Sequence, residues 1–384
     1  YVQISIQVKS DKILCEMEKI LEDTIDLQNK FININNQANI NYLNEFISPQ
    51  FCQEKSNIDR ILLIINCSLI AKPQNYQIYI NYLQQLIPYM IKLYNPIEEL
   101  LNAHYHLFSN FYIASIMIQN GLFTIDQYKI LHPKFALVDF NQPEDPLFVA
   151  MKNDDQCQFQ EICSRINLDI NKKLEYNPCE YFFNDVNIGW KMPSIVEYVA
   201  FCGSIDIFKF LYLQKVNLKL NKLLSYAYAG GNYEIIHLIS ENGFEYDKTD
   251  IPSITIKHHS NELLEYIVDT LDVSLSESAI KNIVECVKSN NIEALNFIFE
   301  HGHETEECIE KALFCSSVQG NLDIFRYLIE VKHANYQKEK PYYKGVSFLT
   351  TAVRNQYVEM IKYIASIIGE NINGWDDIFL SFVF

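Results

Sequence analysis

The chain has 384 residues, of which 49% are hydrophobic, and its formal net charge is −17. This apolar content supports a large buried core and argues against wholesale disorder. The negative charge argues against nucleic-acid binding and against docking on an anionic membrane, because both use clustered Lys and Arg. The longest apolar run, residues 61–71, is far shorter than the ~20 residues of a membrane-spanning helix.

The first part of the chain is predicted to be a set of packed helices. Apolar residues recur at helical spacing over residues 13–21, and residues 58–131 have a strongly apolar helical pattern. Helix breaks are predicted at Lys72-Pro73, at Asn95-Pro96 and at Asn120-Gly121. Residues 132–146 contain three prolines and lose this periodicity. We therefore expect an N-terminal helical region over residues 1–140 and a second region over residues 141–384.

The second region contains a short phrase that recurs six times. It consists of a small or polar residue, two further residues, an acid, an apolar pair and an aromatic residue. The starts are 28, 28, 31, 30 and 36 residues apart, a spacing typical of stacked repeats. The six starts are Gly203, Gly231, His259, Asn290, Gly320 and Gln356. A degenerate first copy is expected near residues 146–176.

Each copy has the pattern of a helix pair. An acid three positions after every start suits the first turn of a helix, where it complements the helix dipole. Apolar residues four and eight positions after the start share one helix face. A modest side chain lies four positions before each start: Val199, Ala227, Thr255, Cys286, Ser316 and Ala352. We expect each unit to be helix, tight turn, helix and loop, and to bury its apolar face by stacking on its neighbours.

This layout resembles the ankyrin repeat over roughly residues 194–368. The shared features are an Ala-bearing first helix, a Gly-Asn or Gly-Ser turn, an apolar second helix and a Gly-ended loop; the closest stretches are residues 195–211 and 313–328. The chain is similar to the large, divergent ankyrin families of unicellular parasitic eukaryotes, in which an uncharacterised helical region precedes the repeats. The Thr-Pro-Leu-His opening of the ankyrin consensus appears in no copy. The resemblance implies an all-α solenoid that binds protein partners and has no catalytic role.

Residues with catalytic or metal-binding chemistry do not fall into a recognised pattern. One group could be arranged into a zinc site, but it lacks the usual ligand spacing: His301, His303, Cys308 and Cys315. The chain has no Gly-rich loop that could hold a phosphate. Its ten cysteines include no C-x-x-C pair, which favours reduced thiols in the cytoplasm, with the nucleus as an alternative. We therefore expect no enzyme activity, no cofactor and no metal ion.

The first helices of the repeats provide a candidate partner-binding surface. The positions two and five before each start are expected to face the groove of the stack. Exposed aromatic residues and Arg are typical of binding hot spots, and basic residues on an acidic protein suit an acidic patch on a partner. The candidate binding residues are Tyr198, Phe201, Tyr226, Lys257, Lys288 and Arg354. The alternative is a solvated face without a partner.

The sequence thus predicts a non-catalytic adaptor or scaffold that binds a partner protein through the groove. Two other functions stay open. The chain could be a structural repeat protein that binds copies of itself, since the apolar residues 375–384 form either a cap or an open edge of the array. An enzyme domain could also lie within residues 1–140, although that region has no clustered Asp, Glu, His or Cys.

Overall fold

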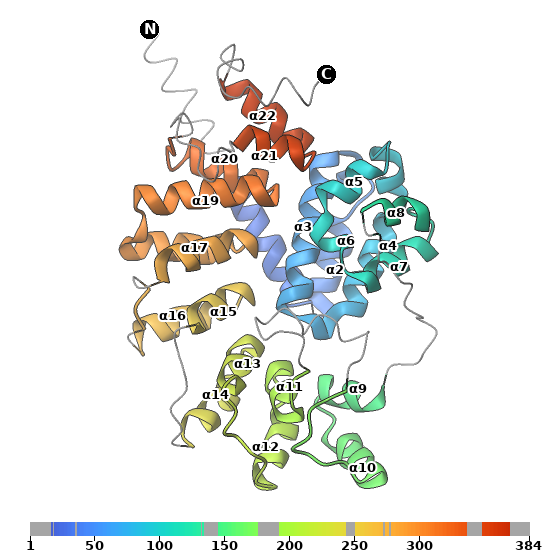
Figure 1. The fold of residues 1–384 in the computed structure, drawn as a ribbon, viewed down its shortest axis with the longest axis vertical. Coiled ribbons are helices and arrows are strands. Elements are labelled where there is room, and N and C mark those ends of the chain that lie inside the picture. Colours follow the sequence, from blue (N-terminus) through green and yellow to red (C-terminus); the bar gives the residue numbers. More distant parts are fainter. Residues whose placement is uncertain are drawn as a thin grey trace. The chain divides into compact units, whose positions relative to one another are not determined.

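The computed structural model describes residues 17, 19–34, 37–131, 133, 145–175, 192–242, 250–271, 273–275, 278–335 and 348–368. Within these residues every regular element is a helix (Figure 1). One isolated bridge joins Lys173 to Ser194. The predicted all-α fold is therefore confirmed. The chain divides into two compact units: unit 1 contains residues 1–65, 86–107 and 275–384, and unit 2 contains residues 66–85 and 108–274.

Unit 1 contains N-terminal helices and the last three repeats. A helix over residues 19–32 is followed by α2 (Gln37–Phe46), the 3-10 turn η1 (Phe51–Gln53), the first part of α3 (Lys55–Ala71), the end of α4 (Tyr76–Leu93), α5 (Glu98–Ala103) and α6 (Tyr105–Phe108). The repeats pair α17 (Ala279–Lys288) with α18 (Ile292–Ile298), α19 (Glu306–Gln319) with α20 (Leu322–Glu330), and α21 (Phe348–Arg354) with α22 (Val358–Ile368). A π-helical turn, η5 (Phe299–His303), continues α18.

Unit 2 contains the other end of α3, the 3-10 turn η2 (Pro73–Asn75), the start of α4, and helices α7 (Phe111–Gln119) and α8 (Ile125–Leu131). Four helix pairs follow: α9 (Pro146–Lys152) with α10 (Gln156–Ile166), α11 (Ile195–Cys202) with α12 (Ile205–Leu213), α13 (Leu223–Gly230) with α14 (Tyr233–Ser240), and α15 (Ile251–Lys257) with α16 (Asn261–Asp269). The first pair lies where the degenerate repeat was predicted. Helix α11 packs between α9 and α13 (Figure 1).

The residue at the start of each recurring phrase has a left-handed backbone. Its φ angle is +73° at Gly203, +77° at Gly231 and +71° at Gly320, a conformation that glycine adopts without a Cβ penalty. His259, Asn290 and Gln356 adopt the same conformation with φ of +51°, +53° and +59°. The phrase found in the sequence therefore marks the tight turn between the two helices of each repeat.

The side chains four positions before these turns lie where adjacent first helices meet. All six have a relative exposure of 0%: Val199, Ala227, Thr255, Cys286, Ser316 and Ala352. Helix α11 packs on α13 in unit 2, and α17 packs on α19 in unit 1. The prediction that modest side chains allow the first helices to approach closely is confirmed.

Asparagine side chains cap the second helices and join successive turns. The side chain of Asn321 accepts a hydrogen bond from the Ile324 amide, and its Nδ2 donates to Asn290 Oδ1 at 2.6 Å. Asn232 caps α14 in the same way, and its Nδ2 donates to the Gly203 carbonyl at 3.0 Å. Each of these residues satisfies helix-end N–H groups and also forms a hydrogen bond to the preceding repeat.

The two compact units cut across the boundary expected near residue 140, because each unit contains both N-terminal helices and repeats. A division of function between residues 1–140 and 141–384 stays a prediction. The apolar residues 375–384, considered as a cap or edge, lie outside the described residues.

Candidate partner-binding surface

The three aromatic residues proposed for the binding surface are buried. Tyr198, Phe201 and Tyr226 have relative exposures of 0%, 2% and 1%. The Tyr198 ring meets Phe148 of α9 edge-on, with 5.1 Å between ring centroids. The Phe201 ring makes similar contacts with Tyr226 at 6.2 Å. The prediction that these side chains are exposed for a partner is therefore wrong.

The reason is the stacking of the first helices in unit 2. Each of these rings projects toward the neighbouring first helix and fills the space that the small residues leave between helices. Burial, followed by the negative charge of Glu197, raises the pKa of the Tyr226 hydroxyl above its usual value. These three residues contribute to the core of unit 2.

The three basic residues proposed for the surface are accessible to different extents. Lys288 and Arg354 are exposed, and Lys257 is half-buried. Each lies in the last turn of a first helix: Lys257 in α15, Lys288 in α17 and Arg354 in α21. A cation in the last turn of a helix interacts favourably with the negative end of the helix dipole and typically stabilises the helix by about 0.3–1 kcal/mol. The position of these residues therefore has a structural explanation as well as a functional one.

In unit 1 the N-terminal helices contact the turns of all three repeats. The buried Gln28 donates its Nε2 hydrogen to the Asn290 carbonyl at 2.6 Å. Arg60 of α3 forms a two-pronged ion pair with Asp323, with N–O distances of 2.9 and 3.3 Å. These contacts hold the helix over residues 19–32 against the α17–α18 turn, and α3 against the first turn of α20.

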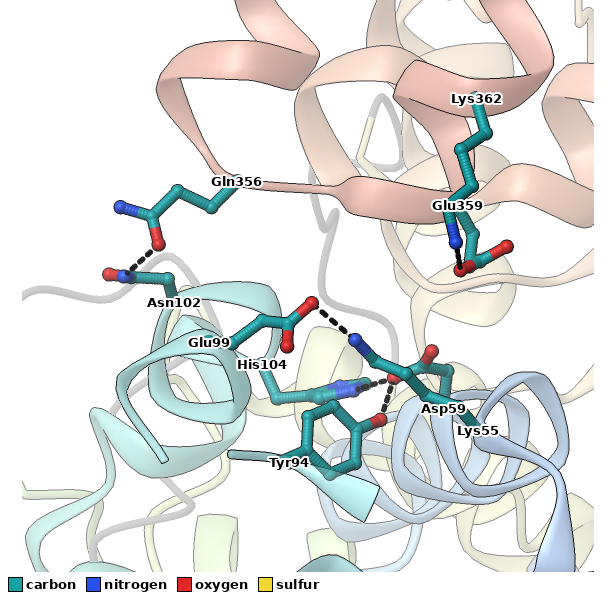
Figure 2. A network of polar contacts seen from close by, with 9 residues as sticks. All are labelled: Lys55, Asp59, Tyr94, Glu99, Asn102, His104, Gln356, Glu359 and Lys362. Carbon is teal, nitrogen blue, oxygen red and sulfur yellow. Dashed lines mark hydrogen bonds and ion pairs between the residues drawn. The ribbon is translucent and has the colours of Figure 1, made fainter. Parts of the chain in front are cut away.

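A polar network lies beside the last repeat of unit 1 (Figure 2). Asp59 of α3 accepts hydrogen bonds from the Tyr94 hydroxyl and lies 2.7 Å from Nε2 of His104. Burial and the Asp59 carboxylate raise the pKa of Tyr94 above its usual value. One carboxylate thus holds two partners from the segments that flank α5.

The same network reaches the repeat through α5. Lys55 forms an ion pair with Glu99, and the Asn102 amide donates to Gln356 Oε1 at 2.8 Å (Figure 2). Gln356 is the left-handed residue of the α21–α22 turn. The edge of the unit 1 repeats that contains the tight turns is therefore occupied by the chain's own N-terminal helices.

Sequence reasoning missed these contacts. The contacting residues are 254 to 263 positions apart in the chain, and neither a spacing nor a motif connects them. The only available signal was local: the acid at the start of each second helix, which includes Asp323, can pair with a cation as well as with the helix dipole.

The structure shows no metal centre and no membrane span in the part of the chain that it describes. No group of three or more His, Cys, Asp or Glu residues that could hold a metal ion is present there. The described cysteines are free thiols, and His301 contacts the Phe297 carbonyl. Among the same residues, no helix has the length and apolar content needed to cross a membrane.

Comparison with known families identifies the repeats. A family described as ankyrin repeats (3 copies) matches residues 283–374, which include most of α17 and all of α18 to α22. No curated protein matches the sequence. The helix pairs of unit 2 have the same turn geometry, with a left-handed residue between two short helices. The chain is therefore an all-α protein that contains an ankyrin-repeat region at residues 283–374.

Proposed function

We propose that this protein is a non-catalytic adaptor or scaffold that binds a partner protein through its ankyrin repeats. Ankyrin repeats generally mediate protein–protein interaction. The observation that carries the proposal is the exposure of Lys288 and Arg354 at equivalent positions of two repeats, two residues before the tight turn. Both lie in unit 1, where α17 packs on α19 and α19 packs on α21.

The spacing of these two cations supports a partner with acidic residues. Stacked helices lie 8–10 Å apart, so two first helices separated by a third place their cations on the order of 20 Å apart. A partner with two acidic positions at that separation would complement them, within a protein whose own charge is −17. Lys257 occupies the equivalent position in unit 2 and is proposed as a separate contact.

Affinity capture from a cell lysate with the full chain tests this proposal. The variant Lys288→Glu/Arg354→Glu should lose a defined partner, and Lys257→Glu should weaken capture by less. The control Lys19→Glu/Lys92→Glu changes the charge equally at exposed residues of the same unit, and Lys92 also lies in the last turn of a helix. Equal capture by the two double variants would reject the proposed contact.

Self-assembly is the second candidate function, and an enzyme domain in residues 1–140 is the third. Sedimentation of the purified chain over a hundredfold concentration range distinguishes an adaptor from a self-assembling protein. A mass that rises with concentration, together with capture of only the chain itself, supports self-assembly. A constant monomer mass supports an adaptor.

A further inference from the structure

Two tyrosine rings are exposed on the second helices of neighbouring repeats in unit 2. Tyr233 in α14 is 48% exposed and Tyr266 in α16 is 40% exposed, although both rings are large and mostly apolar. The rings contact each other edge-on, with 6.1 Å between their centroids. Exposed tyrosines are typical of recognition surfaces, because the ring provides a large contact area at a low cost in conformational entropy.

Two carboxylates lie beside this pair of rings. Glu262 and Glu265 are exposed on α16, and neither forms an ion pair within the described part of the chain. Partial burial, followed by the negative charges of these two residues, raises the pKa of the Tyr233 hydroxyl, so both carboxylates lie within electrostatic range of that ring. Helix α16 itself contains no Lys, Arg or His. The two rings are therefore flanked by negative charge that no ion pair offsets among the described residues.

A cation, a tyrosine ring and a carboxylate meet on the second helices of unit 1. Arg326 of α20 lies over the ring of Tyr363 of α22, with 5.5 Å between its Cζ atom and the ring centroid. The same guanidinium pairs with Glu330 at N–O distances of 3.0 and 3.3 Å, and the Tyr363 hydroxyl donates to that carboxylate at 2.9 Å. One arginine thus interacts with an aromatic ring and a carboxylate together.

The corresponding place in unit 2 has no arginine. Tyr266 and Tyr363 each lie seven residues after the turn residue of their repeat, at the same position of the second helix. The residue of α14 that corresponds to Arg326 is His237, whose Nδ1 atom lies 3.4 Å from the carboxylate of Glu241 in the same helix. No cation of the described residues lies over the ring of Tyr266. An arginine from outside the chain can therefore reach this ring and the carboxylates beside it.

We propose that this surface of α14 and α16 binds an arginine side chain in a basic segment of a partner protein. The contacting residues are Tyr233, Tyr266, Glu262 and Glu265. The planar guanidinium would stack on a tyrosine ring and donate hydrogen bonds to a carboxylate, as Arg326 does within the chain. Arginine fits this surface better than lysine, whose ammonium group is compact, strongly hydrated and has no planar face. The site lies in unit 2 and is independent of the Lys288 and Arg354 surface in unit 1.

Binding of short synthetic peptides to the full chain tests the proposal. The probe is a fluorescently labelled peptide of alternating Arg and Ser, and the comparison is the same peptide with Lys in place of Arg. Anisotropy is measured at physiological ionic strength, because salt screens the long-range attraction of any cation to a chain of charge −17. The wild type should bind the arginine peptide about fivefold more tightly than the lysine peptide.

Substitutions of the two tyrosines separate ring stacking from charge. Tyr233→Leu/Tyr266→Leu keeps the net charge and should weaken binding of the arginine peptide about tenfold. Tyr233→Phe/Tyr266→Phe keeps the rings and should bind nearly as tightly as the wild type. Tyr105→Leu, which removes a 44% exposed ring in unit 1, is the control and should leave the affinity unchanged.

Substitutions of the two carboxylates are compared with the same charge change elsewhere. Glu262→Gln/Glu265→Gln should weaken binding, and Glu306→Gln/Glu307→Gln at exposed residues of α19 in unit 1 should not. Equal affinity for the two peptides, wild-type affinity of the Tyr→Leu double variant, or equal effects of the two Glu double variants would overturn the proposal, since each describes an acidic surface that attracts any polycation. Self-association of the wild type that the arginine peptide reverses would also overturn it, because the occupant would then be a second copy of this chain.

Discussion

Gly230 ends α13 at a place where the neighbouring helix leaves room for no side chain. A Cβ atom there would overlap the Ala200 carbonyl oxygen and would lie 2.7 Å from the carbonyl oxygen of Phe201. Both obstacles are backbone atoms, so they cannot move without shifting α11. The close approach of α11 and α13 therefore depends on this glycine.

We predict that Gly230→Ala lowers the free energy of unfolding by about 1–3 kcal/mol through overpacking. The same exchange in an unobstructed helix would stabilise the protein by about 1 kcal/mol, so the sign of the effect reports the packing. Urea unfolding measures it. Gly302→Ala is the control, since its Cβ would meet open space and only its φ of +86° opposes the change. A neutral or stabilised Gly230→Ala variant would show that the two helices lie farther apart.

The low pKa of the buried His258 side chain leads us to predict that stability depends on pH. Its folded-state pKa of about 3 lies below the ordinary 6.5, so below pH 6.5 the unfolded chain takes up a proton that the folded chain does not. This residue should therefore lower the free energy of unfolding by up to about 1.4 kcal/mol per pH unit as the pH falls from 6.5 towards 3. Unfolding in urea at pH 7.0 and 5.5 should show a smaller pH effect in His258→Leu than in the wild type. An identical pH effect in both proteins would contradict the buried, neutral imidazole.

At the scale of the elements, the helices could be predicted because their signals are local. The acid, the apolar pair and the left-handed turn residue recur within each copy, and all six copies form helix pairs. The burial of Tyr198, Phe201 and Tyr226 could not be predicted in this way. The face that a first helix exposes depends on how closely its neighbours pack, and that information lies in other parts of the chain.

The hydrogen bond between Asn321 and Asn290 can be tested by changing each residue alone and both together. Asn321→Asp keeps the oxygen that caps α20 but loses the Nδ2 donor to Asn290 and brings two acceptors together. We expect it to cost about 1–3 kcal/mol, because both residues are buried. In an Asn290→Gly background the facing oxygen is absent, and the cost should fall by about 1 kcal/mol. Strictly additive effects in urea unfolding would show that the two side chains do not interact.

The Arg60–Asp323 pair predicts measurable coupling between α3 and α20. Both side chains are 22% exposed, and the two-pronged geometry favours a stronger pair than an exposed single contact. A double-mutant cycle with Arg60→Lys and Asp323→Asn should give a coupling energy of about 1 kcal/mol. Asp323→Asn retains a polar group in the first turn of α20. Coupling near zero would mean that the N-terminal helix contributes nothing to this turn.

At the scale of the whole molecule, each compact unit contains both N-terminal helices and repeats. The sequence predicted the repeats but not this arrangement, because contacts such as Gln28 with Asn290 join segments more than 250 residues apart. The proposed function rests on the surface that remains after the N-terminal helices occupy the turn edge of unit 1. That surface includes the exposed ends of α17 and α21.

Site-specific photo-crosslinking of the full chain in a cell lysate tests this claim most directly. The crosslinker is placed at Val318, the equivalent position on α19 between Lys288 and Arg354, and in a second protein at Ser366, which is exposed on α22. The account predicts that one partner protein crosslinks from position 318, that Lys288→Glu/Arg354→Glu abolishes this crosslink, and that position 366 yields none. Crosslinks to the partner from position 366 alone, or only to a second copy of the chain, would contradict it.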